Sequence, residues 1–136
     1  MTATSDQKRL VRKVVKIETL NVNRRHKPKR DSKIYMLNAV WFKPAGGEQR
    51  YRDYMKAVAP LTLRVGGRKL KSFVTDREII GEFDADLLFF IEYPDWQAFK
   101  NVANSAEYHK IAYLKEEAIE KSLLIRCTRP EQPFSA

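Results

Sequence analysis

Two stretches of the chain, residues 36–42 and 87–93, are apolar at nearly every position. A strand with one face in water alternates apolar and polar residues, so these stretches predict strands that are covered on both faces. Helices of a small domain cover one face of its sheet, and a chain of 136 residues leaves little else to cover the other. We therefore expect a homodimer, in which a second copy covers the face built from Met36, Asn38, Val40, Leu88 and Phe90 or from their neighbours of opposite parity.

Two helical regions separate the predicted strands. The first has an apolar stripe and ends at Gly66-Gly67, with Pro60 expected to bend the helix or to end its regular part. The second starts at Asp95, which can cap a helix, is interrupted at residues 104–105 and continues from about residue 106 to 121. The apolar stripes are Tyr51, Tyr54, Met55, Val58, Leu61 and Leu63 in the first region, and Trp96, Phe99, Val102 and Ala103 in the second.

The predicted strands are residues 34–42, 68–75, 85–93 and 122–128, and a polar turn region spans residues 76–84. Together with the helices they give the order βαββαβ, an α+β, ferredoxin-like unit whose central strands are the first and the third. These are the two strands that read as buried on both faces. In this antiparallel order, one end of the sheet is expected to gather Tyr35, Glu92, Tyr93, Arg68, Lys69 and Arg126.

The net charge of +9 is concentrated near the N-terminus. Residues 1–33 hold eleven Lys and Arg against three Asp and Glu, a net charge of +8, so residues 34–136 add only +1. This basic arm either binds a polyanion such as nucleic acid, through the Arg24–Arg30 region, or packs on a neighbouring subunit. No aromatic residue interleaves residues 24–30, so a stacking platform for single strands is absent there. A short helix capped by Thr4 and an edge strand over residues 14–22 are both compatible with the arm's pattern.

The composition argues against a membrane span, a signal peptide, a disulfide and a zinc site. No stretch of the sequence is apolar enough for a membrane span, and residues 1–8 lack the apolar run of a signal peptide, so we expect a cytoplasmic protein. Cys127 is the only cysteine and excludes an intramolecular disulfide. Because His26 and His109 lie far apart in sequence, no zinc-type spacing exists, and we expect neither a metal nor another cofactor.

Three short motifs occur on matching elements: Gly66-Gly67-Arg68, Glu92-Tyr93-Pro94 and Ser105-Ala106-Glu107-Tyr108. In this set and order the chain resembles the bacterial domain of unknown function 1330, of the dimeric α/β barrel superfamily, over about residues 34–129. The resemblance implies two ferredoxin-like sheets paired face to face. It also implies kinship with small cofactor-free monooxygenases, muconolactone-isomerase-like enzymes and haem-associated proteins, although the family itself has no settled activity.

The chain departs from the family pattern at two points: Lys115 stands where an Arg is common, and the basic arm precedes the matching region. We accordingly expect three segments: the arm (1–33), the barrel domain (34–129) and a C-terminal tail (130–136).

The candidate ligand-binding residues are Arg68, Glu92, Tyr108, Lys115 and Asn38. Glu92 lies in a strand that is expected to be buried, so its carboxylate needs a cation to stay ionised, and Arg68 is the nearest predicted partner. The pair is either a structural ion pair, or Glu92 is a functional carboxylate that acts as a base. Lys115 lies on the helical stripe of Tyr108, so its ammonium either snorkels to water or points into a cleft that suits an acidic ligand. Asn38, alone among apolar neighbours, is expected to mark the cavity.

The weak catalytic candidates are Glu92, Tyr108 and His109, and His109 is more simply a solvent-exposed residue. The large aromatic residues read as core or dimer interface rather than as a ligand box: Trp41, Phe42, Phe89, Phe90 and Trp96. Three functions stay open. The protein binds or transforms a small acidic or carbonyl-bearing molecule without a metal, binds nucleic acid or an anionic surface through its arm, or is a structural dimer without a ligand. The sequence leaves open whether it is an enzyme.

Overall fold

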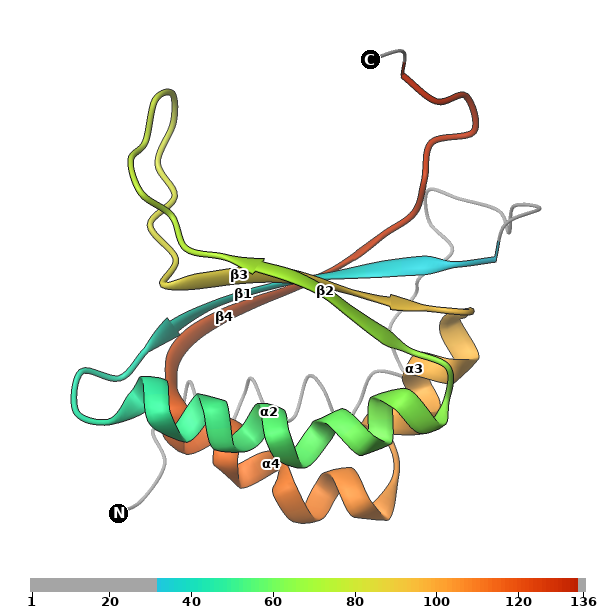
Figure 1. Cartoon of the computed structure of the whole chain (residues 1–136), viewed down its shortest axis with the longest axis horizontal. Coiled ribbons are helices and arrows are strands. Elements are labelled where there is room, and N and C mark those ends of the chain that lie inside the picture. Colours follow the sequence, from blue (N-terminus) through green and yellow to red (C-terminus); the bar gives the residue numbers. More distant parts are fainter. Residues whose placement is uncertain (1–31, 135–136) are drawn as a thin grey trace.

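The computed structural model describes residues 32–134, which form four strands and three helices (Figure 1). The order of elements confirms the predicted βαββαβ unit. The elements are β1 (Ile34–Phe42), α2 (Gly47–Arg64), β2 (Arg68–Phe73), β3 (Leu87–Tyr93), α3 (Trp96–Ala103), α4 (Ala106–Ala118) and β4 (Ile119–Cys127). Residues 1–31 of the basic arm, with the motifs proposed within it and its Arg24–Arg30 region, lie outside the described residues.

The strands form one antiparallel sheet in the order β2-β3-β1-β4, which confirms the predicted α+β, ferredoxin-like fold with β1 and β3 at the centre. In the register, Tyr35 lies opposite Glu92, and Arg68 lies opposite Glu92 on its other side. Met36 lies opposite Arg126 on β4. The predicted gathering of these residues at one end of the sheet is therefore confirmed.

All three helices cover the same face of the sheet (Figure 1). On this helix-covered face, alternate residues of β1 and β3 are buried and form the core with the helices. The strand residues concerned are Ile34, Met36, Asn38, Val40, Phe89, Ile91 and Tyr93, none of them more than 9% exposed. The hydrophobic core thus lies between the sheet and the helix layer.

The opposite face of the sheet, called here the open sheet face, is apolar as well. It carries Leu37, Trp41, Phe73, Leu88, Phe90, Leu123 and Ile125, as the strand pairings place them. No helix among residues 32–134 covers it, and Phe73 and Ile125 are 61% and 44% exposed. Such an uncovered apolar surface is what the two wholly apolar strands predicted for a single copy of the chain.

The predicted composition of the dimer face was wrong, because it combined residues of both faces. Met36, Asn38 and Val40 lie on the helix-covered face, whereas Leu88 and Phe90 lie on the open sheet face. When both faces of a strand are apolar, the sequence offers no alternation from which to read the parity.

Some predicted boundaries also differ from the structure. Helix α2 continues through Pro60 to Arg64, with Pro60 exposed to solvent. Helix α4 ends at Ala118 and β4 starts at Ile119, three residues earlier than predicted, because Ile119 pairs with Phe42 across a register shift. Strand β3 starts at Leu87 rather than at residue 85, since the Asp86 carboxylate accepts a hydrogen bond of 2.7 Å from the Phe42 backbone N–H.

Candidate functional site

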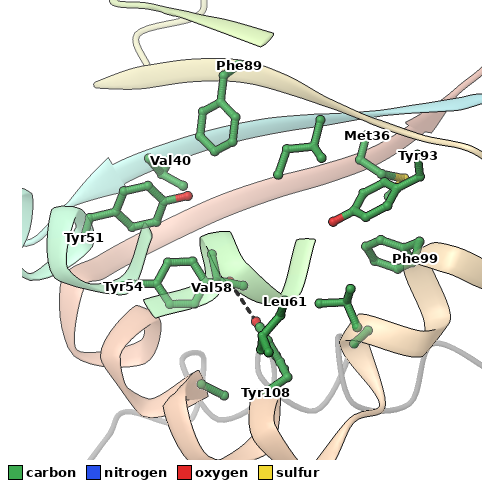
Figure 2. Close-up of a cluster of buried hydrophobic side chains, with 14 of the residues drawn as sticks. Met36, Val40, Tyr51, Tyr54, Val58, Leu61, Phe89, Tyr93, Phe99 and Tyr108 are labelled. Atoms are coloured by element: carbon green, nitrogen blue, oxygen red, sulfur yellow. Dashed lines mark hydrogen bonds between the residues drawn. The ribbon is translucent and has the colours of Figure 1, made fainter. Parts of the chain in front are cut away.

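A small cavity of about 50 Å³ lies in the core between the sheet and the helices. Its wall combines apolar side chains with four tyrosines that come from three elements: Tyr51 and Tyr54 on α2, Tyr93 on β3, and Tyr108 on α4 (Figure 2). The other polar side chains of the wall are Asn38, Thr62 and Lys115. Three candidate residues of the sequence, Asn38, Tyr108 and Lys115, are therefore brought together around one space.

The Ser105-x-x-Tyr108 motif fixes one side of this cavity. Ser105 is the N-cap of α4, and its hydroxyl accepts a hydrogen bond of 3.0 Å from the Tyr108 backbone N–H. The cap holds Tyr108 in the first turn of the helix, where its side chain reaches Tyr54. The two hydroxyl groups lie 2.9 Å apart and share a hydrogen bond (Figure 2). Burial raises the pKa of both tyrosines, so both stay neutral at physiological pH.

The other two motifs lie side by side. Gly66 has a φ of 83° and follows the last turn of α2, and the N–H groups of Gly66 and Gly67 donate to the carbonyls of Leu63 and Thr62. This is the Schellman arrangement, which requires a residue in the left-handed region. Opposite these two glycines lies the segment that ends β3.

The close approach of the two segments explains their glycines. A Cβ on Gly66 would lie 3.0 Å from Pro94, and a Cβ on Gly67 would lie 3.0 Å from the Tyr93 ring and 2.7 Å from Thr62. The third residue, Arg68, pairs with Glu92. Absence of side chains at both glycines thus lets the end of α2 press the Tyr93 ring into the wall of the cavity. Burial, partly opposed by a hydrogen bond with Thr62, raises the pKa of Tyr93 to about 12.

Among the described residues of the cavity wall, Lys115 alone is cationic. It lies two turns after Tyr108 on the same side of α4, and its Nζ is 6.0 Å from the centroid of the Tyr54 ring. None of the ion pairs among residues 32–134 involves it. Desolvation lowers its pKa to about 8, because no carboxylate of the described chain compensates for the burial of the charge.

Asn38 lies on the floor of the cavity, on the helix-covered face of β1. It is 8% exposed, and its Nδ2 donates a hydrogen bond of 3.1 Å to the Met36 carbonyl. The amide thereby satisfies its donor within its own strand. The sequence predicted this residue to mark a cavity, and it lines the one described here.

The remaining candidates lie elsewhere. Glu92 is on the open sheet face and forms an ion pair of 3.4 Å with Arg68, whose side chain is 67% exposed. Neither residue lines the cavity, although Arg68 lines a second, wider groove between α2 and strands β2 and β3. His109 is exposed on α4. Of the three catalytic candidates only Tyr108 lines the cavity, whose described wall holds no carboxylate, histidine or cysteine.

The wider groove lies beside the cavity, towards the edge of the sheet. It has a volume of about 950 Å³ and runs between α2 and strands β2 and β3. Cavity and groove are adjacent, because they share five residues of their walls: Tyr51, Met55, Val58, Thr62 and Ile91. The rim of the groove carries four cationic and two anionic side chains: Arg52, Lys56, Arg68 and Lys69, and Glu48 and Asp86.

Sequence reasoning placed Tyr51 and Tyr54 in an apolar stripe and missed their role in the cavity wall. The signal that could have found them is the number of tyrosines at helical spacing, because a buried phenol hydroxyl needs a polar partner whereas Phe or Leu does not.

Among residues 32–134, no three His, Cys, Asp or Glu side chains form a group that could hold a metal ion. None of the helices in this range is both long and apolar enough to cross a membrane.

Comparisons with known proteins agree with this fold. Residues 35–126 match the model of the family described as domain of unknown function 1330. A protein of unknown function from Rhodopseudomonas palustris has a similar crystal structure, with a TM-score of 0.70, 25% identity and coverage of 97% of each chain. No match was found among curated proteins.

More distant solved structures share the fold. One is a dimeric ferredoxin-like protein of unknown function from Jannaschia, with a TM-score of 0.56, 12% identity and coverage of 71% of this chain and 98% of that one. Another is SnoaB from Streptomyces nogalater, a cofactor-independent oxygenase, with a TM-score of 0.53, 15% identity and coverage of 74% of this chain and 96% of that one.

Proposed function

The chain belongs to the family of domain of unknown function 1330, whose model matches residues 35–126, and on that premise we propose a homodimer in which each protomer binds one small molecule. The ligand carries an acidic or carbonyl group that lies near Lys115 and an apolar body that extends into the groove. The adjacent cavity and groove share wall residues, and a ligand that occupies both is larger than the cavity alone.

The observation that carries this proposal is the state of Lys115. Lys115 is half-buried, and a desolvated ammonium without a carboxylate partner among residues 32–134 is costly; the lowered pKa of about 8 reflects that cost. An anionic or strongly polar ligand group beside Nζ would compensate for the lost hydration. The shared hydrogen bond of Tyr54 and Tyr108 leaves one hydroxyl able to donate to the same group.

The dimer is supported by the open sheet face. Its exposed apolar side chains, among them Phe73, Leu123 and Ile125, favour a second copy as the cover. A dimer is also the state named for the ferredoxin-like neighbours from Jannaschia and from Bacteroides fragilis. Because their identity to this chain is low, they support the arrangement through their fold alone.

The proposal is one of binding, with a proton donor close to the ligand. Catalysis by a nucleophile needs an adjacent base, and the described cavity wall offers phenols, one amine, the Thr62 hydroxyl and the Asn38 amide, without a carboxylate or an imidazole. The oxygenase neighbour shares the fold at 15% identity, so its reaction is not transferred to this chain. A role for Glu92 as a base is less well supported, because this residue is paired with Arg68 and lies on the open sheet face.

Native mass spectrometry of the purified full chain tests the proposal. We expect the mass of a dimer, together with a retained small molecule that is lost from the Lys115→Met variant. A monomer at micromolar concentration would contradict the dimer. A polyanion bound through the arm would instead show a steep loss of affinity with added salt, whereas occupancy of the cavity and groove should respond little.

A further inference from the structure

The loop between β2 and β3, residues 74–86, projects from the sheet on the side opposite to the helices (Figure 1). Its base is held by specific contacts. The Trp41 Nε1–H donates to the Asp84 carboxylate at 2.9 Å, the Thr75 hydroxyl donates to the Ala85 carbonyl at 2.8 Å, and the Trp41 and Phe83 rings meet edge to face. The loop is therefore an anchored projection of the sheet.

The tip of this loop combines apolar and acidic residues. Ile79 and Ile80 are 83% and 96% exposed, which is unusual for adjacent large apolar side chains. Asp76, Glu78 and Glu82 flank them, against Arg77 as the one basic residue of the loop. None of the ion pairs among residues 32–134 involves these three carboxylates. Such a tip suits a surface that is apolar in its centre and cationic at its rim.

The groove between α2 and β2 has this character. Its floor includes Met55, Leu87 and Ile91, and the cations at its rim outnumber the anions by two. Glu48 is already paired with Arg52, and Asp86 accepts the Phe42 N–H, so the rim anions are engaged within the protomer. Lys56 and Lys69 are exposed at the rim, and the Lys69 ammonium also donates to the Ser72 hydroxyl and the Leu70 carbonyl of its own strand.

The tip of the loop lies away from its own groove, although Val74 and Asp86 at the base of the loop line that groove. The loop rises on the open side of the sheet, whereas the groove lies on the side of α2 (Figure 1). A second copy paired through the open sheet face has the opposite orientation. Two face-to-face sheets lie about 10 Å apart, and half of a 13-residue loop, extended at about 3.3 Å per residue, reaches roughly 20 Å. The tip can therefore pass the partner's sheet at its edge.

We propose that the loop of residues 74–86 crosses the edge of the partner's sheet and places Ile79 and Ile80 over the mouth of the partner's groove, with Glu78 and Glu82 beside the partner's Lys56 and Lys69. The inference rests on the proposed dimer and specifies its second contact. Each ligand site is then closed by a loop of the other subunit, and the site is incomplete in a monomer.

Zero-length cross-linking of an isotopic mixture tests this contact. Unlabelled and ¹⁵N-labelled samples of the full-length chain are mixed, unfolded and refolded together. The refolded mixture is then treated with a carbodiimide, which joins carboxylates directly to amines. We expect cross-linked peptide pairs that join Glu78 or Glu82 to Lys56 or Lys69. In part of these pairs one peptide should be unlabelled and the other ¹⁵N-labelled, which shows that they come from different subunits. The Glu78→Gln/Glu82→Gln variant should lose these peptides, and Glu120→Gln should keep them.

A second measurement follows the apolar part of the contact. Acetic anhydride should modify Lys56 and Lys69 more slowly in the wild-type dimer than in the Ile79→Ser/Ile80→Ser variant, while the exposed Lys110 reacts equally in both. Phe134→Ser, which replaces an apolar residue that is 90% exposed outside the loop, should leave all three rates unchanged.

The two proposals can fail separately. A dimer that yields no such cross-links, or only cross-links within one isotope, overturns the loop contact and leaves the proposed dimer intact. Equal acetylation rates of Lys56 and Lys69 in the wild type and the isoleucine variant overturn it as well. A wild-type monomer overturns the dimer itself.

Discussion

The hydroxyl groups of Tyr54 and Tyr108 lie 2.9 Å apart and join helices α2 and α4 inside the core. The bond is polar in otherwise apolar surroundings, and the two rings meet edge to face with their centroids 6.3 Å apart. Because Ser105 caps α4 through the Tyr108 N–H, the cap, the hydrogen bond and the cavity wall form one unit.

Removing one of the two hydroxyls should destabilise the fold. Tyr108→Phe leaves the Tyr54 hydroxyl buried without its partner, which costs about 1–3 kcal/mol of the free energy of unfolding. The double variant Tyr54→Phe/Tyr108→Phe should cost less than the sum of the single variants, since neither hydroxyl is then left unsatisfied. Urea unfolding measures all three, with the exposed Tyr113→Phe as control. Strictly additive losses would show that the two hydroxyls do not depend on each other.

Stability should depend on Lys115 in a defined pH window. The pKa of Lys115 is about 8 in the folded chain against a usual 10.5, so between these values the unfolded chain binds more protons and the free energy of unfolding rises with pH. Above about pH 10 the four buried tyrosines reverse the trend, because their raised pKa values keep them protonated only in the folded chain. Urea unfolding at a series of pH values measures this dependence. The rise of the free energy of unfolding with pH should be absent in Lys115→Met and present in Lys110→Met. A rise that persists in Lys115→Met would assign it to another group.

Adjacent phenylalanines offer a matched test of the two sheet faces. Phe89 is 1% exposed in the core, whereas Phe90 lies on the open sheet face. Phe90→Glu should give a folded monomer, because the charge would be buried only in the dimer. Phe89→Glu should lower the free energy of unfolding by several kcal/mol and unfold the domain, because its charge would be buried in the core. Gel filtration and circular dichroism separate the two results. A Phe90→Glu protein that stays dimeric would place the interface elsewhere.

A larger residue at the second position of the two-glycine motif should destabilise the fold. Gly67→Ala introduces a Cβ at 2.7 Å from the Thr62 Cγ2 and 3.0 Å from the Tyr93 ring, and overpacking of this kind costs about 1–3 kcal/mol. Thr62→Ser in the same protein removes the closest contact and should restore part of the loss. Thermal unfolding measures both. No change on Gly67→Ala would show that the α2 terminus can move away from β3.

Deletion of residues 1–33 should leave a folded domain, because the described elements begin at Ile34. Calorimetry of the truncated chain should show one cooperative transition. Loss of cooperativity would make the arm part of the core. If the full chain binds nucleic acid, the deletion should abolish that binding, and binding that survives would move the site to residues 34–136.

The pattern of apolar residues predicted the order and type of every described element. Strand β1 is bounded as predicted, because loop residues follow Phe42 directly. The N-caps Asp95 and Ser105 accept the hydrogen bonds typical of their residue type, and Asp95 was predicted to do so. Local signals of this kind depend on neighbours in sequence, which is why they could be read without a structure.

What the sequence could not provide was the side of the sheet on which a residue lies. Glu92 and Tyr93 are adjacent, and only the register shows that Tyr93 lines the cavity while Glu92 lies on the open sheet face. The position of the groove beside the cavity depends on how α2 packs against β2 and β3, which is a tertiary property. Lys115 was recognised from its helical stripe, yet only the fold shows that no ion pair among residues 32–134 involves it.

The central claim is that Lys115 anchors the acidic group of a ligand, and a titration with 2-naphthoate, an aromatic carboxylate, tests it most directly. Calorimetry at pH 7, where Lys115 is charged, compares the full-length wild type with Lys115→Met and with Lys110→Met, a lysine exposed on the same helix. We predict binding to the wild type and to Lys110→Met, and an affinity weaker by about 1.5–3 kcal/mol for Lys115→Met, the contribution of a hydrogen bond to a charged group. Equal affinity of all three proteins for 2-naphthoate would contradict the claim and leave Lys115 as a lysine whose stem merely covers apolar surface.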